Sequence, residues 1–155
     1  MDKHSDVSSI KVGFLYLLVL LVCFAISGCA GVGSTIPQER RISLTETENN
    51  QGNFSYGALT VKYSYSLVGG NLISAGSNMI LAGKISYRDR FDSLDVRILF
   101  LDAAGTVLRQ EFVYSSGYRT GDKSSNRAFQ KTFAVPAGSV AMTFNYSAQD
   151  RAGHR

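Results

Sequence analysis

The sequence predicts an all-β domain: an antiparallel sandwich of about seven strands, preceded by a signal peptide helix and a flexible tether. From residue 54 onward, apolar residues recur at every second position, which is the period of a half-buried strand. Short segments rich in Gly, Asn, Asp and Pro interrupt this pattern at the spacing expected of turns. After residue 28 no segment shows the 3.6-residue period of an amphipathic helix.

The N-terminal segment is apolar and ends in small residues. Residues 12–25 carry no charge and lead into Ile26-Ser27-Gly28-Cys29. The run is shorter than the roughly 20 apolar residues that a membrane-spanning helix needs. Small residues at its end suit a signal-peptide cleavage site. We therefore expect residues 1–28 to be removed; an uncleaved N-terminal anchor and cleavage without further modification are the alternatives.

Ile26, Ser27, Gly28 and Cys29 resemble the lipobox of bacterial lipoproteins, with Ile in place of the commoner Leu. The resemblance implies that Cys29 becomes the N-terminus and is acylated, with the lipid bilayer as its partner. Two or more acyl chains anchor a protein stably, whereas one chain does so only marginally. Ala30 stands where enteric lipoproteins retained in the inner membrane tend to have Asp. This implies the outer membrane, with the domain facing the periplasm.

Composition excludes some partners and stabilising devices. The net charge is +4, and it stays +4 without residues 1–28 because that segment holds two basic and two acidic residues. No dense basic cluster of the kind that binds nucleic acid is present. Cys29 is the only cysteine after residue 28, so no disulfide can form within the domain. Stability must come from buried apolar surface.

The expected organisation has four parts. Residues 1–28 are the signal peptide, and residues 29–53 are the lipidated cysteine and a flexible tether whose apolar content is low. Residues 54–148 form the β-sandwich, and residues 149–155 are a loose tail. Within the tether, residues 41–45 alternate between polar and apolar and are a candidate for a short edge strand.

The first strands of the sandwich are expected over residues 61–67 and 79–87, separated by a turn at Gly69-Gly70-Asn71. Gly83 interrupts the second of these strands. A glycine inside a strand marks a bulge or the close approach of another chain segment.

A hairpin is expected over residues 94–101 and 107–114. Its first strand becomes fully apolar toward its end, which indicates that this end is covered on both faces. Asp102 and Gly105 provide the turn chemistry. In the return strand Leu108, Phe112 and Tyr114 are expected on the apolar face. Two further strands follow over residues 129–135 and 140–146, joined by a turn at residues 136–138.

Residues 81–135 resemble the immunoglobulin-like domains of prokaryotic lipoproteins that carry a Phe-x-Leu-Tyr-Asp signature. The matching features, in order, are Gly83, Phe100-Leu101-Asp102 and the turn at Gly105. This chain departs from the signature because the three residues are consecutive and lack the Tyr, and because Pro-Gly is absent before the later Phe-rich strand. The resemblance implies an immunoglobulin-like β-sandwich with an accessory role and no defined ligand.

Residues 115–126 form the longest connection and are the first candidate for a binding site, since most connections are about 4 to 6 residues long. Tyr118, Arg119, Lys123 and Arg127 would supply its aromatic and polar lining. A solvated crossover between the two sheets explains the same residues.

Catalytic and metal-binding chemistry finds little support. The only histidine after residue 28 is His154, near the C-terminus, so a nucleophile would lack its usual base. Asp89, Asp92 and Asp95 could bind Ca2+, but the arginines among them favour a salt-bridged corner. We expect no metal, no cofactor and no enzymatic activity.

The expected function is a structural or protein-interaction module of the envelope with a protein partner. The alternative is a glycan- or peptidoglycan-binding module that uses the loop at residues 115–126.

Overall fold

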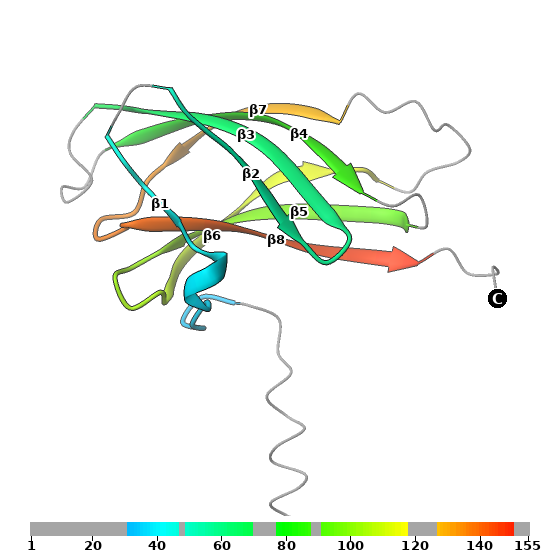
Figure 1. Ribbon diagram of the computed structural model, residues 1–155, viewed down its shortest axis with the longest axis horizontal. Helices are drawn as coiled ribbons and strands as arrows, with labels where there is room; N and C mark the ends of the chain where they lie inside the picture. The colour runs from blue at the N-terminus through cyan, green and yellow to red at the C-terminus, as the bar shows by residue number, and fades with distance from the viewer. Residues whose placement is uncertain (1–30, 47–48, 70–76, 88–90, 118–126, 151–155) are drawn as a thin grey trace, which may run out of the picture.

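The computed structural model describes residues 31–46, 49–69, 77–87, 91–117 and 127–150, which form two four-stranded sheets packed face to face (Figure 1). This arrangement confirms the predicted all-β sandwich. Its elements are the 3-10 helix η1 (Gln38–Arg40) and the strands β1 (Ile42–Ser43), β2 (Asn50–Tyr56), β3 (Leu59–Val68), β4 (Asn78–Tyr87), β5 (Phe91–Leu101), β6 (Val107–Ser115), β7 (Ala128–Ala134) and β8 (Ala141–Asp150).

All strand pairs are antiparallel, and the strand orders are β1-β8-β5-β6 and β2-β3-β4-β7. Strands β4 and β7 pair in one sheet, whereas the strands that follow each of them, β5 and β8, pair in the other. The immunoglobulin fold interlocks its B and E strands with its C and F strands in the same way. The place beside β8, where that fold has its last strand, is taken here by β1 from the N-terminal end.

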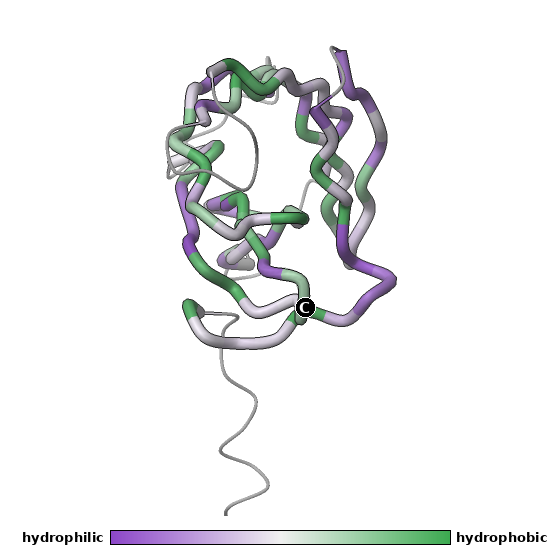
Figure 2. Tube along the Cα trace, turned by 90° about the vertical axis from the view of Figure 1, so that its left-hand side faces the viewer, coloured by the Kyte–Doolittle hydropathy of each residue, from purple (hydrophilic) through white to green (hydrophobic). Residues whose placement is uncertain are grey.

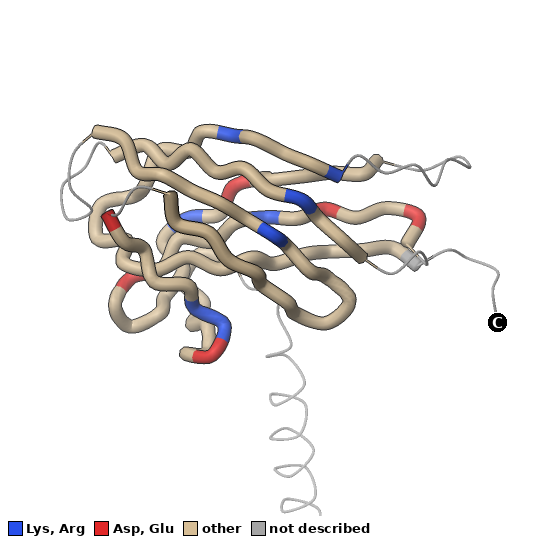
Figure 3. The backbone as a smooth tube through the Cα atoms, turned by 45° about the horizontal axis from the view of Figure 1, so that its top comes forward, with Lys and Arg blue, Asp and Glu red and all other residues tan. Residues whose placement is uncertain are grey.

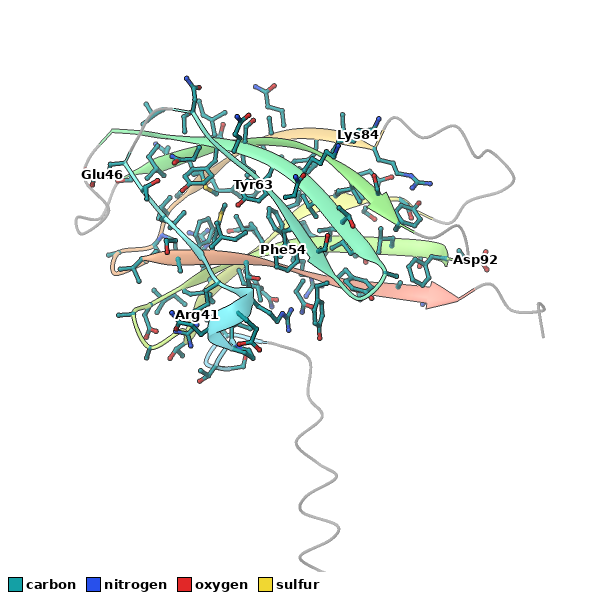
Figure 4. All side chains as sticks on the ribbon, in the orientation of Figure 1. Arg41, Glu46, Phe54, Tyr63, Lys84 and Asp92 are labelled. Atoms are coloured by element: carbon teal, nitrogen blue, oxygen red, sulfur yellow. The ribbon has the colours of Figure 1, made fainter. Side chains whose placement is uncertain are left out.

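The main core lies between the sheets and contains one face of every long strand. Along much of the trace in Figure 2, hydrophobic and hydrophilic residues alternate, as the period of a strand requires. Aromatic rings fill the centre: the ring of Phe144 lies 5.5 Å from that of Phe54 and 5.6 Å from that of Tyr63. The side chain of Phe54 points between the two sheets in Figure 4. Residues that alternate inward along β3 and β4, such as Val61 and Leu81, are fully buried, as predicted.

Gly83 marks a close approach of chain segments, which was one of the two predicted possibilities. A Cβ atom at this position would overlap the backbone carbonyl oxygen of Lys62 on β3 and would lie 2.8 Å from the ring of Phe129 on β7. Only glycine at position 83 therefore allows the backbone of β3 and the ring of Phe129 to lie this close to the middle of β4.

The turn between β5 and β6 has the predicted chemistry. The Oδ1 atom of Asp102 accepts a hydrogen bond of 2.7 Å from the backbone N–H of Thr106. Gly105 has a φ angle of +85°, which an L-residue adopts only at a cost.

The predicted face of β6 is right for Tyr114, which packs against the main core, and wrong for Phe112, because this strand contains two extra residues. Its register against β5 shifts between Phe100 and Leu101 and again between Val96 and Arg97, which leaves Leu108 and Val113 without opposing residues. Each β-bulge reverses the alternation that follows it. As a result Val113 is buried, whereas Phe112 lies outside the core with 48% of its surface exposed.

The structure also differs from the expectation before residue 54. Strand β2 begins at Asn50 and was not predicted, because Phe54 is its only buried residue. The candidate edge strand at residues 41–45 is present as β1, paired with β8. Residues 31–46 do not form the expected tether: they are packed and hydrogen-bonded along the β1-β8-β5-β6 sheet, with Ile36 and Leu44 buried.

Candidate functional surfaces

Residues 31–44 form a strap that binds the β1-β8-β5-β6 sheet, and we call this segment the N-terminal strap. It begins beside β6, where the N–H of Gly33 donates to the carbonyl oxygen of Val107 at 2.9 Å and the N–H of Val107 donates to that of Ser34 at 2.8 Å. It ends on the opposite side of the sheet as β1, next to β8. In Figure 1 η1 and the segment before it lie beneath this sheet, on the side away from β2, β3 and β4, and β1 then rises along the edge of the sheet.

The strap covers a second, smaller core on the outer face of the sheet. Ile36 is 2% exposed and clusters with buried residues of β5, β6 and β8, namely Leu99, Leu101, Val107 and Ala141. Leu99 and Leu101 face away from the main core, which explains why the end of β5 is apolar on both faces. Burying such side chains provides about 1.5 to 3 kcal/mol each, which adds to the hydrogen bonds that hold the strap.

Arg41 fastens the strap to the turn between β5 and β6. Its Nε atom donates to the carbonyl oxygen of Ile36 at 2.8 Å, and its Nη2 atom donates to that of Ala104 at 2.9 Å. Gly105 leaves the space that the guanidinium fills, because a Cβ atom there would collide with it. Arg40, its neighbour in η1, instead stacks on the ring of Tyr56, with 3.5 Å between the guanidinium carbon and the ring centroid. The strap is thus joined to both sheets (Figure 4).

The outer face of the β2-β3-β4-β7 sheet is mostly polar, with Val68 and Ile80 as exposed apolar residues, and carries no acidic residue within the described strands. Its lysines, Lys62 and Lys84, are exposed and lie directly opposite each other on β3 and β4. Like charges in opposing positions destabilise a strand pair. No described acidic residue pairs with either lysine, and Figure 3 shows how sparse charge is on the strands. The other outward residues are Gln51, Asn53, Ser55, Thr60, Ser64, Ser66, Val68, Asn78, Ile80, Ala82, Ser86, Ala128, Gln130, Thr132 and Ala134.

Among the predicted binding residues, Arg127 alone is described, and its side chain is largely buried. Its guanidinium lies 3.8 Å from the centroid of the Tyr87 ring, and its Nη1 atom donates to the carbonyl oxygen of Tyr87 at 3.3 Å. Arg127 is 9% exposed, so it closes the end of the sandwich and offers little surface to a ligand. Tyr118, Arg119 and Lys123 lie outside the described residues, as do Ile26, Ser27, Gly28 and Cys29.

The acidic corner contributes no metal site in the described part of the chain, where no group of three metal-ligating side chains occurs. Asp95 accepts a hydrogen bond of 2.6 Å from the hydroxyl of Ser115 on the neighbouring strand. Asp89 and His154 lie outside the described residues.

Tyr63 has the one resolved pKa shift among the described titratable groups. Burial in the core raises the pKa of its phenol, and the adjacent Tyr65 adds to the effect. The two rings stack with 6.4 Å between their centroids. Because Tyr63 is a partly buried residue packed against the main core, this shift concerns stability at high pH.

No protein-family model, curated protein or solved structure matches this chain. Within the described residues, no helix has the length and apolarity to span a membrane.

Proposed function

We propose that this chain is a lipid-anchored protein of the bacterial envelope whose β-sandwich is a non-enzymatic structural or protein-interaction module facing the periplasm from the outer membrane. The observation that carries the proposal is the tetrapeptide Ile26-Ser27-Gly28-Cys29 at the end of an uncharged apolar run. Acylation of Cys29 would place the anchor two residues before the strap. The chain would then need no other membrane segment.

The sandwich suits a binding role because one sheet face stays open. The strap covers part of the outer face of the β1-β8-β5-β6 sheet, whereas the outer face of β2-β3-β4-β7 has no segment hydrogen-bonded across it among the described residues. After residue 28 the sequence offers one cysteine and one histidine, His154 near its end. These residues favour a binding module over an enzyme.

The test is the intact mass and membrane fractionation of the protein expressed in a Gram-negative host. Wild type should begin at Cys29, carry the added mass of acyl chains and sediment with the outer membrane. Cys29→Ser should lose both the added mass and the sedimentation. Cys23→Ser changes the other cysteine of the chain, inside the apolar run, and should behave as wild type. Equal masses for wild type and Cys29→Ser would overturn the proposal.

A glycan-binding module is the second candidate, and the unpaired lysines Lys62 and Lys84 favour it. An acid-free face of hydroxyl, amide and ammonium groups fits an anionic glycan, whose charge would relieve the repulsion between the two lysines. Retention of the protein on purified peptidoglycan sacculi tests this function. Loss of retention in the Lys62→Ala/Lys84→Ala double variant assigns binding to the sheet face, whereas loss in Tyr118→Ala or Arg119→Ala assigns it to the loop. No retention of wild type removes the glycan function.

A further inference from the structure

Only a very short length of free chain separates the strap from the proposed anchor. The chain is fixed from Gly31 onward, because the carbonyl oxygen of Gly31 accepts hydrogen bonds from the N–H and the hydroxyl of Ser34, at 3.0 and 2.6 Å. An extended residue spans at most about 3.6 Å, so the Cα atoms of Cys29 and Gly31 lie within about 7 Å of each other. The headgroup region of each leaflet is about 5 to 8 Å deep. A domain tethered this closely cannot stand clear of the bilayer.

The start of the strap also fixes which side of the domain is near the lipid. Gly33 pairs with Val107, the first residue of β6, so the chain enters along this edge of the β1-β8-β5-β6 sheet. Val32, next to that pairing, is 65% exposed. In Figure 1 η1 and the segment before it lie on the outer side of this sheet.

A second exposed apolar side chain, that of Phe112, lies on β6 itself. Phe112 of β6 is opposite Arg97, and the next pair on the same face joins Gln110 to Leu99, whose side chain lies in the cluster under Ile36. Phe112 therefore shares the outer face with the strap. Its ring carries the guanidinium of Arg97 at 4.4 Å from the centroid. An aromatic ring beside a cation is chemistry suited to a membrane–water interface, where the ring contacts acyl chains and the cation contacts anionic headgroups.

We propose that the anchored domain rests on the bilayer through the β6 side of the β1-β8-β5-β6 outer face, with Val32 and Phe112 at the boundary between headgroups and acyl chains. The outer face of β2-β3-β4-β7, with Lys62 and Lys84, then points away from the membrane and is the surface open to partners. This inference rests on the proposed acylation of Cys29, and it deepens the proposed function by assigning one face to the lipid and the other to the partner.

The chain contains no tryptophan, so a single introduced Trp reports on one site. We would produce the full-length chain in a Gram-negative host as Phe112→Trp, as Val32→Trp and, as the matched control on the opposite sheet, as Ile80→Trp, which replaces a side chain that is 37% exposed. Each acylated protein is reconstituted into vesicles of phosphatidylethanolamine and phosphatidylglycerol, with and without brominated acyl chains. Intact mass is measured on the same samples, and circular dichroism checks that each variant is folded.

The expected result is quenching by brominated lipid that is several-fold stronger for Phe112→Trp and Val32→Trp than for Ile80→Trp, with a blue-shifted emission at the first two positions. Equal quenching at all three positions, or stronger quenching at Ile80→Trp, in proteins of acylated mass would overturn the orientation and leave the anchor intact. A mass without acyl chains would overturn the anchor itself, and the orientation with it.

Discussion

The contact between Arg41 and Gly105 makes a sharp test of whether the N-terminal strap is an integral part of the domain. Gly105 has a φ angle of +85°, and a Cβ atom at this position would collide with the guanidinium of Arg41. Gly138 is a matched control, because its φ angle is +81° and a Cβ atom there would meet nothing within 4 Å. Gly105→Ala thus adds backbone strain and the clash, whereas Gly138→Ala adds the strain alone.

The magnitudes follow from these two costs. An alanine in the left-handed region costs roughly 1 to 2 kcal/mol. Displacing Arg41 breaks its hydrogen bonds to Ile36 and Ala104, which are partly exposed and together contribute about 1 to 2 kcal/mol. We therefore expect Gly105→Ala to lower the free energy of unfolding by about 2 to 4 kcal/mol, and Gly138→Ala to lower it by about 1 to 2 kcal/mol.

Urea denaturation followed by circular dichroism measures both changes. For this assay we would use a version of the protein that begins at residue 30 and so lacks Cys29. It keeps the whole core, because every buried core residue lies within residues 36–144. The same glycine substitutions are then made in an Arg41→Ala background, which removes the group that the new Cβ atom strikes. There Gly105→Ala should cost no more than Gly138→Ala, which gives a coupling energy of about 1 to 2 kcal/mol. Equal costs for the two glycines with Arg41 present would refute the packed strap.

Three further predictions use the same measurement. Ile36→Ala should lower the free energy of unfolding by about 2 to 4 kcal/mol because it empties the outer core, whereas Val32→Ala, four residues earlier and exposed, should change it by less than about 0.5 kcal/mol. Phe144→Ala should cost about 3 to 5 kcal/mol, since the ring is fully buried between Phe54 and Tyr63. The raised pKa of Tyr63 means that this phenol ionises first in the unfolded chain, near pH 10, so the stability that it contributes is fully present below about pH 10 and is lost as the pH rises above it. Tyr63→Phe should flatten that fall, and an unchanged slope would refute the raised pKa.

The regular parts of the fold could be predicted from the sequence because their side chains obey a single period. Val61 and Phe144 alternate with polar residues and both lie in the main core. The turn at Asp102 and Gly105 was equally predictable, since each residue type has a specific backbone role there.

The side on which Phe112 lies could not be predicted, because a bulge adds a residue without leaving a mark in the hydrophobic pattern. Val113 and Phe112 are both apolar, and only the register against β5 decides which one is buried. Phe112, on which the proposed membrane contact depends, was assigned to the wrong side for this reason.

The sequence did not predict the strap, because residues 31–44 include few apolar residues. Local composition also cannot show which distant residues these apolar side chains contact. Ile36 is held by Leu99 and Leu101, which lie far along the chain. A signal was nevertheless present: β5 ends in a run that is apolar on both faces, and this required a cover. The sequence predicted the covered strand end but could not identify residues 31–44 as its cover.

The position of β1 beside β8 has a consequence for how the protein forms. The pairs Ile42 with Met142 and Ser43 with Ala141 join the two ends of the domain, so that sheet cannot be completed until the final strand has been made. Contacts between such distant residues must overcome the entropy of closing a long loop, which slows folding. Until then Ile42 lacks its strand partner, and the strap is held by β5, β6 and the turn between them. Completion of the last strand therefore determines when the first segment of the domain is locked in place.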